Sequence, residues 1–327
     1  MPELPSQLRL LRDFYYATAL KLPADTSWAH AHRLIDRPAF FTVEHLQRHL
    51  NNPLLMPGWF SLYWQGKAVD CMPAVGNKVV QNATLSILNK CIIQEYLSHG
   101  AALLLEGVEC LEPDINAMCA AIDAPHTHVM SNSVVFFSQR GSEAYRGHFD
   151  TDDALVIHLG GQKKWRIYER VPPRLIDQGN LSVEQLGKVQ AEIVMNPGDA
   201  LFVKSCTPHL VETTAPYALH MTFDICDHNV SAETALNLLT QEFAREAAHS
   251  YTPPEGVVDK LMQHARSPGY GKRIQELQSA QAENCKRTRT MLSGNHVTHF
   301  TQLMAADATN LLDESARQPA NMKRIRL

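Results

Sequence analysis

The spacing of hydrophobic residues changes along the chain and divides it into three parts. In the first part, residues 38–52 carry apolar side chains at helical spacing, and Thr42 stands where it can cap a helix. Residues 102–105 have the composition of a short buried strand, and a helix is expected to begin after Pro113 with Asp114 in its first turn. These signals predict an N-terminal part that mixes helices with strands.

In the second part the pattern changes to short runs rich in β-branched and aromatic residues. Gly, Pro, Asn and Asp separate these runs, as is typical of strands joined by turns. The predicted strands lie within residues 128–139, 153–161, 163–169, 191–204 and 217–225, with a turn at 196–199 in the fourth run. Several short strands at this spacing predict a sandwich or a barrel.

In the third part, beyond Asp227, the pattern is helical, and Ser231 is placed to cap the first helix. The predicted helices span residues 231–250, 255–267, 269–292 and 296–316, and a short basic tail follows at 321–327. We therefore expect an N-terminal buttress over residues 1–94, a barrel over 95–228 and a helical C-terminal region over 229–327.

Composition narrows the class of protein. The chain has 327 residues, 45% of them hydrophobic, which is enough for a large core. A formal net charge of −4 gives no overall attraction to nucleic acid. Seven scattered cysteines without a CxxC pair argue against a disulfide framework and fit a reducing cytoplasm. The charged N-terminus and the lack of a long apolar segment make secretion and membrane insertion unexpected.

The stretch "RGHFDTDDALVIHLGG" places His148 and Asp150 two residues apart beside a predicted strand. Residues at this spacing project to the same side, so an imidazole and a carboxylate can meet at one point. His209 follows the turn and strand of "NPGDALFVKSCTPH" and can supply a third ligand from a facing strand. Two histidines and one carboxylate form the facial triad of Fe(II) oxygenases, which leaves positions open for a cosubstrate and O2.

Chance must be weighed, because the chain has sixteen histidines and most isolated HxD pairs lie in solvated loops. The combination of HxD before an apolar run with a histidine after the PGD turn favours the metal site. His158 is interpreted as a hydrogen-bonded core histidine, and His220 is expected to line the barrel near the site.

Lys163 occupies an unusual position in "KKWRIYE". Strand alternation puts Lys163, Trp165 and Ile167 on the more apolar face. Burying an ammonium costs several kcal/mol unless an anion meets it, so an anionic ligand such as a cosubstrate carboxylate is expected there. The alternative is that Lys163 lies at the strand's end and extends to water.

These motifs together resemble the JmjC-type oxygenases of the cupin superfamily, and among them the ribosomal-oxygenase branch. The matching residues are His148, Asp150, Asp153, Gly161, Lys163, Trp165, Pro197, Gly198, Asp199 and His209. The resemblance implies a mainly β double-stranded β-helix of the jelly-roll or cupin type, with an N-terminal α/β buttress and an all-helical C-terminal region.

The resemblance also implies a site. Fe(II) would be held by His148, Asp150 and His209, and 2-oxoglutarate would pair its distal carboxylate with Lys163. Asn132 or Ser138, on the preceding strand, would be further cosubstrate partners. The branch carries dimerisation helices followed by a winged-helix domain, but the last hundred residues here predict helices without its β-hairpin. A homodimer through these helices is expected, and a ribosomal substrate is put in doubt.

Three functions follow from these observations. The first is an Fe(II)- and 2-oxoglutarate-dependent hydroxylase acting on a protein or peptide side chain with release of succinate and CO2. The second uses the same chemistry to tailor a small molecule or a biosynthetic peptide. The third is a cupin that binds a metal without turnover and serves as an interaction protein; an inward Lys163 argues against it, because such a protein has no need of a cosubstrate lysine.

Overall fold

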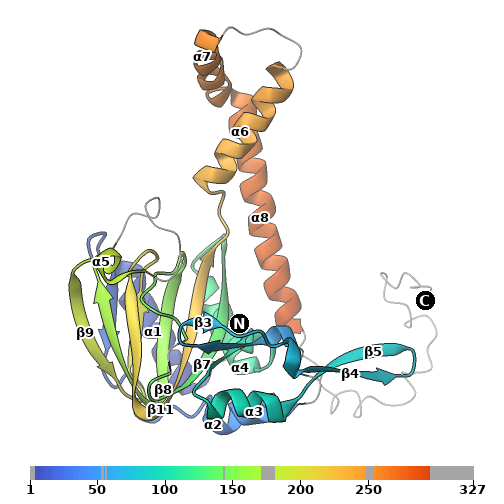
Figure 1. Cartoon of the computed structure of the whole chain (residues 1–327). Helices are drawn as coiled ribbons and strands as arrows, with labels where there is room; N and C mark the ends of the chain where they lie inside the picture. Colours follow the sequence, from blue (N-terminus) through green and yellow to red (C-terminus); the bar gives the residue numbers. More distant parts are fainter. Residues whose placement is uncertain are drawn as a thin grey trace, which may run out of the picture.

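The computed structural model describes residues 4–52, 55, 57–142, 144–170, 181–247 and 254–294. A barrel-like sheet with covering helices forms one body, and a bundle of helices projects from it (Figure 1). The strands are β1 (Trp28–Ala31), β2 (Phe60–Trp64), β3 (Lys67–Ala68), β4 (Val75–Val80), β5 (Ala83–Leu88), β6 (Ala102–Glu106), β7 (Val129–Gln139), β8 (Asp153–Tyr168), β9 (Val189–Met195), β10 (Ala200–Val203) and β11 (His209–Asp227).

Some helices lie against this sheet, and others form the bundle that projects from it (Figure 1). The α-helices are α1 (Ser6–Ala17), α2 (Val43–Leu50), α3 (Lys90–Ser98), α4 (Pro113–Asp123), α5 (Val183–Leu186), α6 (Ala232–Ala247), α7 (Pro254–Ala265) and α8 (Pro268–Gly294). Short 3-10 helices lie at Ala19–Lys21, Pro57–Trp59, Met72–Ala74 and Val108–Cys110. Among the described helices, none combines the length and the apolar character that a membrane span requires.

Nine strands form one antiparallel sheet. Its order is β1-β10-β8-β11-β7-β6-β2-β3, with β9 pairing the second half of β8. Strands β1, β2 and β3 come from the first 70 residues, so the N-terminal part completes the sheet rather than only supporting it. Strands β4 and β5 form a separate hairpin that stands away from the barrel (Figure 1).

The sequence predicted two strands at 153–161 and 163–169, and this prediction was wrong. They form one continuous strand, β8, which pairs with β11 on both sides of an irregularity at Gly161. Gly161 has a φ of +68°, and a Cβ there would lie 1.8 Å from the Tyr217 carbonyl oxygen. Only glycine allows so close an approach at a positive φ. Gly161 therefore lets β8 bend and continue as one strand.

Other predictions from the sequence were confirmed. Helix α2 begins directly after Thr42, whose backbone N–H donates to His45 Nδ1 at 3.2 Å. Strand β6 and helix α4 begin where the apolar run and the proline predicted them. Ser231 caps α6, because its Oγ accepts the Thr234 backbone N–H at 3.0 Å. The helix and basic tail expected at 296–327 fall outside the described residues.

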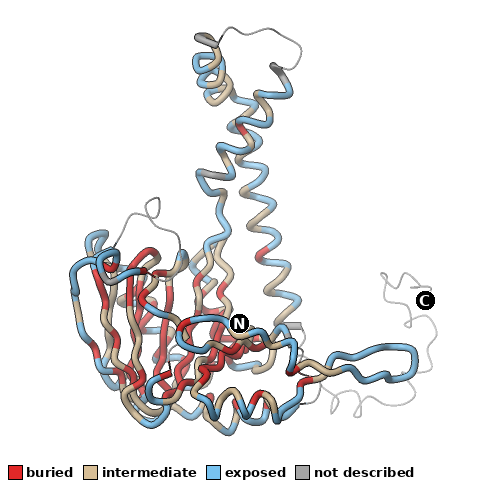
Figure 2. Tube along the Cα trace, in the orientation of Figure 1, coloured by how far each residue is buried: buried red, intermediate tan, exposed pale blue. Residues whose placement is uncertain are grey.

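The main core lies between the sheet and helices α1 and α4. Leu8, Leu11 and Tyr15 of α1 are buried, and the Tyr15 ring lies 6.2 Å from that of Phe202 on β10. Each large apolar side chain enclosed in this way contributes about 1.5–3 kcal/mol. Figure 2 shows that the buried residues concentrate in the barrel, whereas the projecting helices are mostly exposed.

Helix α8 returns from the projecting bundle to the barrel. At its end, Arg289 Nε lies 2.7 Å from Asp123 Oδ2 of α4, and another guanidinium nitrogen donates to the Ser131 carbonyl of β7 at 2.7 Å. Fork-shaped guanidinium bonds of this kind fix geometry as well as charge. The helical bundle is thus fastened to the barrel at a defined point.

Candidate metal and ligand site

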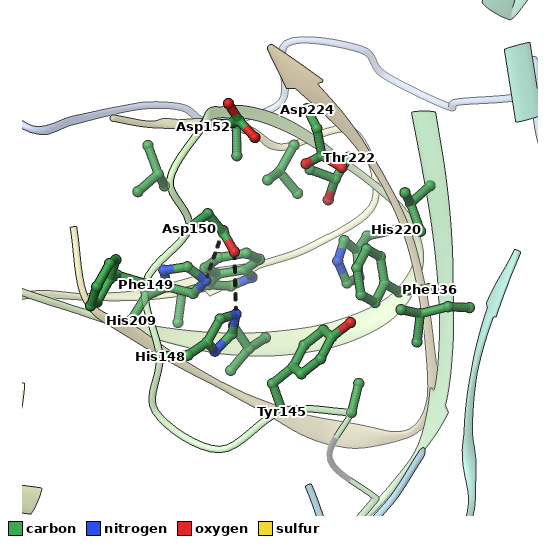
Figure 3. Close-up of a pocket in the computed structure, with 18 of the residues that line it drawn as sticks. Phe136, Tyr145, His148, Phe149, Asp150, Asp152, His209, His220, Thr222 and Asp224 are labelled. Carbon is green, nitrogen blue, oxygen red and sulfur yellow. Dashed lines mark ion pairs between the residues drawn. The ribbon is translucent and has the colours of Figure 1, made fainter. Parts of the chain in front are cut away.

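Two backbone hydrogen bonds bring the predicted metal ligands together. His148 N–H donates to the His209 carbonyl at 3.0 Å, and His209 N–H donates to the His148 carbonyl at 2.7 Å. Asp150 lies between the rings, 3.7 Å from His148 Nε2 and 3.7 Å from His209 Nε2 (Figure 3). The three ligand atoms are all within 4.8 Å of one another. Residues 61 positions apart in the sequence therefore converge as a single facial triad.

Both histidines are held in the orientation that metal binding needs. His148 Nδ1 lies 2.8 Å from the Arg146 carbonyl oxygen, and His209 Nδ1 lies 3.1 Å from the Thr207 carbonyl oxygen. A carbonyl can only accept, so each Nδ1 carries a proton, and each Nε2 is the ring atom turned towards Asp150 and left for a metal. Burial, with the neighbouring His209 ring, lowers the pKa of His148 to about 4, which keeps its imidazole neutral.

The segment before His209 is fixed to the HxD loop. Cys206 adopts a positive φ of 59°, and its N–H donates to the Asp150 carbonyl at 2.7 Å. Asp153 accepts the Ser205 N–H at 2.7 Å, which explains the second aspartate of the motif as a brace rather than a ligand. The metal ligands are thus oriented by bonds from their own loops.

A cavity of about 560 Å³ opens beside the triad. Lys163 lies in its wall with 5% of its surface exposed, as strand alternation predicted, and its Nζ is 5.9 Å from the centre of the Phe136 ring. Burial alone lowers the pKa of Lys163 to about 7. On the opposite face of β8, Lys164 and Arg166 form ion pairs with Glu192. Lys163 therefore faces the cavity, whereas Lys164 and Arg166 on the other face of β8 are paired with Glu192.

The remaining sequence candidates fall in different places. Asn132 lines the cavity, and its amide nitrogen lies 3.6 Å from Cys226 Sγ. Ser138 is buried and bonded to Thr213 Oγ1 at 2.7 Å, and it does not belong to the described lining of this cavity. His220 lines the cavity as expected, whereas His158 is fully buried outside it.

Sequence reasoning placed Trp165 on the inner face of its strand but missed two lining residues, Tyr145 and Asp224. The Trp165 ring stacks on His209 at 5.4 Å, and the Tyr145 ring lies 4.9 Å from that of His148. Asp224 projects into the cavity from β11, on the same face as His220 (Figure 3). The period-two alternation used for Lys163 would have found Asp224, because it lies four residues beyond a histidine already expected to point inward.

Unsatisfied polar atoms mark the cavity as a place for ligands. His220 Nδ1 and Trp165 Nε1 have no hydrogen-bond partner among the described residues, although both side chains are only 4% exposed. The His220 ring stacks on Phe136 with centres 4.6 Å apart. Buried polar atoms without partners cost about 1–3 kcal/mol each, so bound molecules that pair them are favoured.

Residues 111–233 match the JmjC domain family. A bifunctional lysine-specific demethylase and histidyl-hydroxylase, NO66, of Drosophila willistoni is 24% identical over 174 residues, covering 52% of this chain and 23% of that protein. NO66 of Drosophila mojavensis is 21% identical over 267 residues, covering 68% of this chain and 30% of that protein. The chain thus spans less than a third of the length of these relatives.

Solved structures share the fold. Escherichia coli ycfD aligns with a TM-score of 0.52 at 14% identity, covering 80% of this chain and 69% of that chain. The complex of the ribosomal oxygenase YcfD with cobalt and 2-oxoglutarate aligns with a TM-score of 0.50 at 14% identity, over 79% and 69% of the two chains. The resemblance inferred from the motifs, to JmjC-type oxygenases of the ribosomal-oxygenase branch, is confirmed.

Proposed function

From the JmjC domain over residues 111–233, we propose that this chain is an Fe(II)- and 2-oxoglutarate-dependent oxygenase that hydroxylates a protein or peptide side chain. One observation carries the proposal: the triad of His148, Asp150 and His209 faces the same cavity as a buried lysine that pairs with no anion among the described residues. A metal would bind to the triad, and an anionic cosubstrate beside it would pair with the lysine.

The residues present fit Fe(II). Two neutral imidazoles and one carboxylate on one side of a cation leave its other side open to the cavity. His148 and His209 would bind through Nε2, since each Nδ1 is bonded to a backbone carbonyl. Bound there with 2-oxoglutarate and O2, iron supplies the oxidising power for C–H hydroxylation, with succinate and CO2 as the other products.

The residues of the inner cavity fit a dicarboxylate. Lys163 would hold the distal carboxylate of 2-oxoglutarate, and that anion would restore the charged form of the amine. Asn132 offers an amide on the same cavity wall and is a proposed partner of the cosubstrate, whereas Ser138 is bonded to Thr213 Oγ1 outside the described lining. His220 Nδ1 and Trp165 Nε1 are further groups that a bound anion or its waters could satisfy.

The apolar lining has a separate task. Val156, Val203 and Val211 project into the cavity beside Trp165, and all four limit the space available to water near the triad. Excluding water protects the oxidising step from side reactions and fixes the target C–H bond at the metal.

The finer architecture forms part of the same proposal. We infer a double-stranded β-helix over 95–228, flanked by the regions 1–94 and 229–327. A cytoplasmic location is supported by seven cysteines that are all free.

We also propose that the chain forms a homodimer through its projecting helices. Leu236 of α6 and Val258 of α7 are 60% and 66% exposed, and Met262, Leu277 and Met291 add further apolar surface. Apolar groups along a bundle that stands free of the barrel are typical of a buried interface (Figure 2). Size-exclusion chromatography with light scattering should give twice the monomer mass, and a strict monomer would refute the dimer.

Turnover without substrate tests the proposed function most directly. Purified protein with Fe(II), ascorbate and 2-oxoglutarate in air is expected to form succinate, and His148→Ala and Lys163→Ala should each abolish it. Binding of 2-oxoglutarate to the Mn²⁺-loaded protein is measured in parallel, because some oxygenases turn over only with substrate. Failure of both succinate formation and 2-oxoglutarate binding would favour a non-catalytic metal-binding cupin.

A further inference from the structure

The loop that carries His148 and Asp150 has a second face, turned away from the cavity. Phe149 lies between these two residues, and Figure 3 shows its ring pointing away from the place where Asp150 meets the two histidines. Phe149 packs in a small apolar cluster that is separate from the main core, and every member is at most 8% exposed. This rear cluster consists of Phe149, Tyr168, Leu181, Leu186 and Cys206.

Leu186 is the member of the rear cluster that packs on Gly147, the residue directly before His148. A Cβ at Gly147 would lie 2.7 Å from each terminal methyl carbon of Leu186. The φ of Gly147 is not positive, so the contact with Leu186, and not the backbone conformation, favours a glycine there. Leu186 is 4% exposed, so its side chain has little room to move aside.

Backbone hydrogen bonds join the rear cluster to both ends of this loop. Leu181 N–H donates to the Gly147 carbonyl at 2.7 Å, and Cys206 N–H donates to the Asp150 carbonyl at 2.7 Å. The carbonyl that orients the His148 ring belongs to Arg146, one residue before Gly147. A shift of the chain at Gly147 would therefore move a metal ligand and disturb the bond that orients it.

The segment that supplies Leu186 is too short to be stable alone. Helix α5 has four residues, and an isolated helix of that length does not persist in water. Ser182 caps it, since Ser182 N–H donates to Gln185 Oε1 at 2.8 Å. The cap closes the turn but does not attach it to the barrel, so the position of α5 depends on the contacts that Leu181 and Leu186 make with Gly147.

We propose that Leu186 is a positioning residue of the metal site: it holds Gly147 from the side opposite to the cavity and so fixes the spacing of His148 and Asp150. This inference rests on the metal site of the proposed function and adds a residue that lies outside the described cavity lining. Because coupling between two binding events is reciprocal, the docking of α5 strengthens metal binding, and a bound metal stabilises the docked α5.

The first test measures Mn²⁺ affinity by electron paramagnetic resonance, without cosubstrate or turnover. Leu186→Ala should weaken Mn²⁺ binding about tenfold, as for other groups that hold metal ligands in place. Leu186→Met, which fills similar space, should restore most of the affinity. Ile93→Ala is the matched control, because Ile93 is also 4% exposed but belongs to the main core; it should lower the stability of the protein and leave Mn²⁺ affinity unchanged.

A double-mutant cycle tests the contact itself. Gly147→Ala places a methyl group against Leu186 and should also weaken Mn²⁺ binding about tenfold. Leu186→Ala makes room for that methyl group, so the two losses should not multiply. The double variant should bind Mn²⁺ about tenfold more weakly than the wild type, whereas independent effects would give about a hundredfold.

Hydrogen exchange tests the reciprocal effect. Saturation of the wild type with Mn²⁺ should slow amide exchange over residues 181–187 several-fold and leave exchange in α3 unchanged. Equal exchange in α5 with and without Mn²⁺ would overturn the coupling.

Unchanged Mn²⁺ affinity in Leu186→Ala would overturn the inference and leave the proposed function intact. An equal loss in Ile93→Ala would also overturn it, because the effect would then follow general stability. A wild type that binds no Mn²⁺ would refute both the inference and the metal site. Weaker binding in Leu186→Ala, in a protein that forms no succinate, would support the positioning role and count against the oxygenase. If Leu186→Ala fails to fold, Leu186→Val takes its place.

Discussion

Polar groups at the triad of His148, Asp150 and His209 differ from those on the walls of the cavity, Lys163 and Asp224, in whether they have partners within the protein. At the triad, His148 and His209 are each bonded to a backbone carbonyl, so their ring orientation is fixed before any metal arrives. On the walls, no described anion pairs with Lys163 and no described cation pairs with Asp224. The contrast suggests where the protein prearranges geometry and where it leaves charges for its ligands to neutralise.

The largest effect is expected at the prearranged end. His209→Ala removes one ligand and also the ring on which Trp165 stacks, so Mn²⁺ binding and succinate formation should fall at least about 100-fold. Electron paramagnetic resonance measures the bound Mn²⁺, and circular dichroism checks the fold. His99→Ala, at an exposed histidine directly after helix α3, is the control. Unchanged metal binding in His209→Ala would show that His209 is not a metal ligand and would contradict the comparison.

Substitution of Lys163 should weaken ligand binding and at the same time increase the stability of the ligand-free protein. Lys163→Met removes a buried, unpaired cation, so the ligand-free protein should become more stable by about 1–3 kcal/mol while 2-oxoglutarate binding is lost. Denaturant unfolding and calorimetry measure the two effects. Lys164→Met is the control on the same strand, because Lys164 is half-buried and pairs with Glu192; it should change neither quantity by more than about 1 kcal/mol. A destabilised Lys163→Met would mean that the amine has a native partner.

The same lysine predicts a pH dependence. Its pKa is lowered to about 7 in the free protein, and a bound dicarboxylate would raise it. A group whose pKa is higher in the complex favours the complex fully below the free pKa, and this contribution is lost as pH rises above it. Affinity for 2-oxoglutarate should therefore fall above pH 7, by up to about tenfold per pH unit. Lys163→Arg, if it binds, should remove this dependence.

The smallest effect is expected at Asp224. Its raised pKa means that the folded protein holds the proton more tightly than the unfolded chain. The loss of folding stability caused by ionised Asp224 is therefore absent well below pH 4 and grows up to about pH 7. Asp224→Asn should therefore stabilise the protein by about 1 kcal/mol at pH 8 and by nothing measurable at low pH. Thermal unfolding at the two pH values tests this. A stabilisation equal at both would assign the effect to packing instead of charge.

Much of the site could be predicted because it depends on short-range patterns. His148 and Asp150 lie two residues apart, Lys163 has the parity of a buried strand position, and Ser231 stands before an apolar helix. Each prediction needed only a local period and the chemistry of one side chain. The pairing of His209 with the HxD loop needed more: it required the assumption of a closed barrel in which the ends of two facing strands meet, and the family resemblance supported that assumption.

The rest depended on contacts between distant segments. The continuity of β8 could not be inferred, because glycines ordinarily separate strands and only the partner β11 shows that Gly161 bends one. The sheet's use of β1 and β2 depends on pairings between residues 169–175 positions apart for β1 with β10 and 39–45 positions apart for β2 with β6. Asp224 was within reach of the alternation rule, but its lack of a partner is a property of the folded cavity and of no single segment.

Gly161 also limits how this barrel can change. Every other amino acid would bring a Cβ against the Tyr217 carbonyl, so a mutational library that varies position 161 samples almost only broken barrels. The cavity positions face open space and carry no such restriction. Evolution or design could therefore change the ligand that the protein accepts by substituting Asp224 and its neighbours. Position 161, at the bend between the two halves of β8, would have to remain glycine.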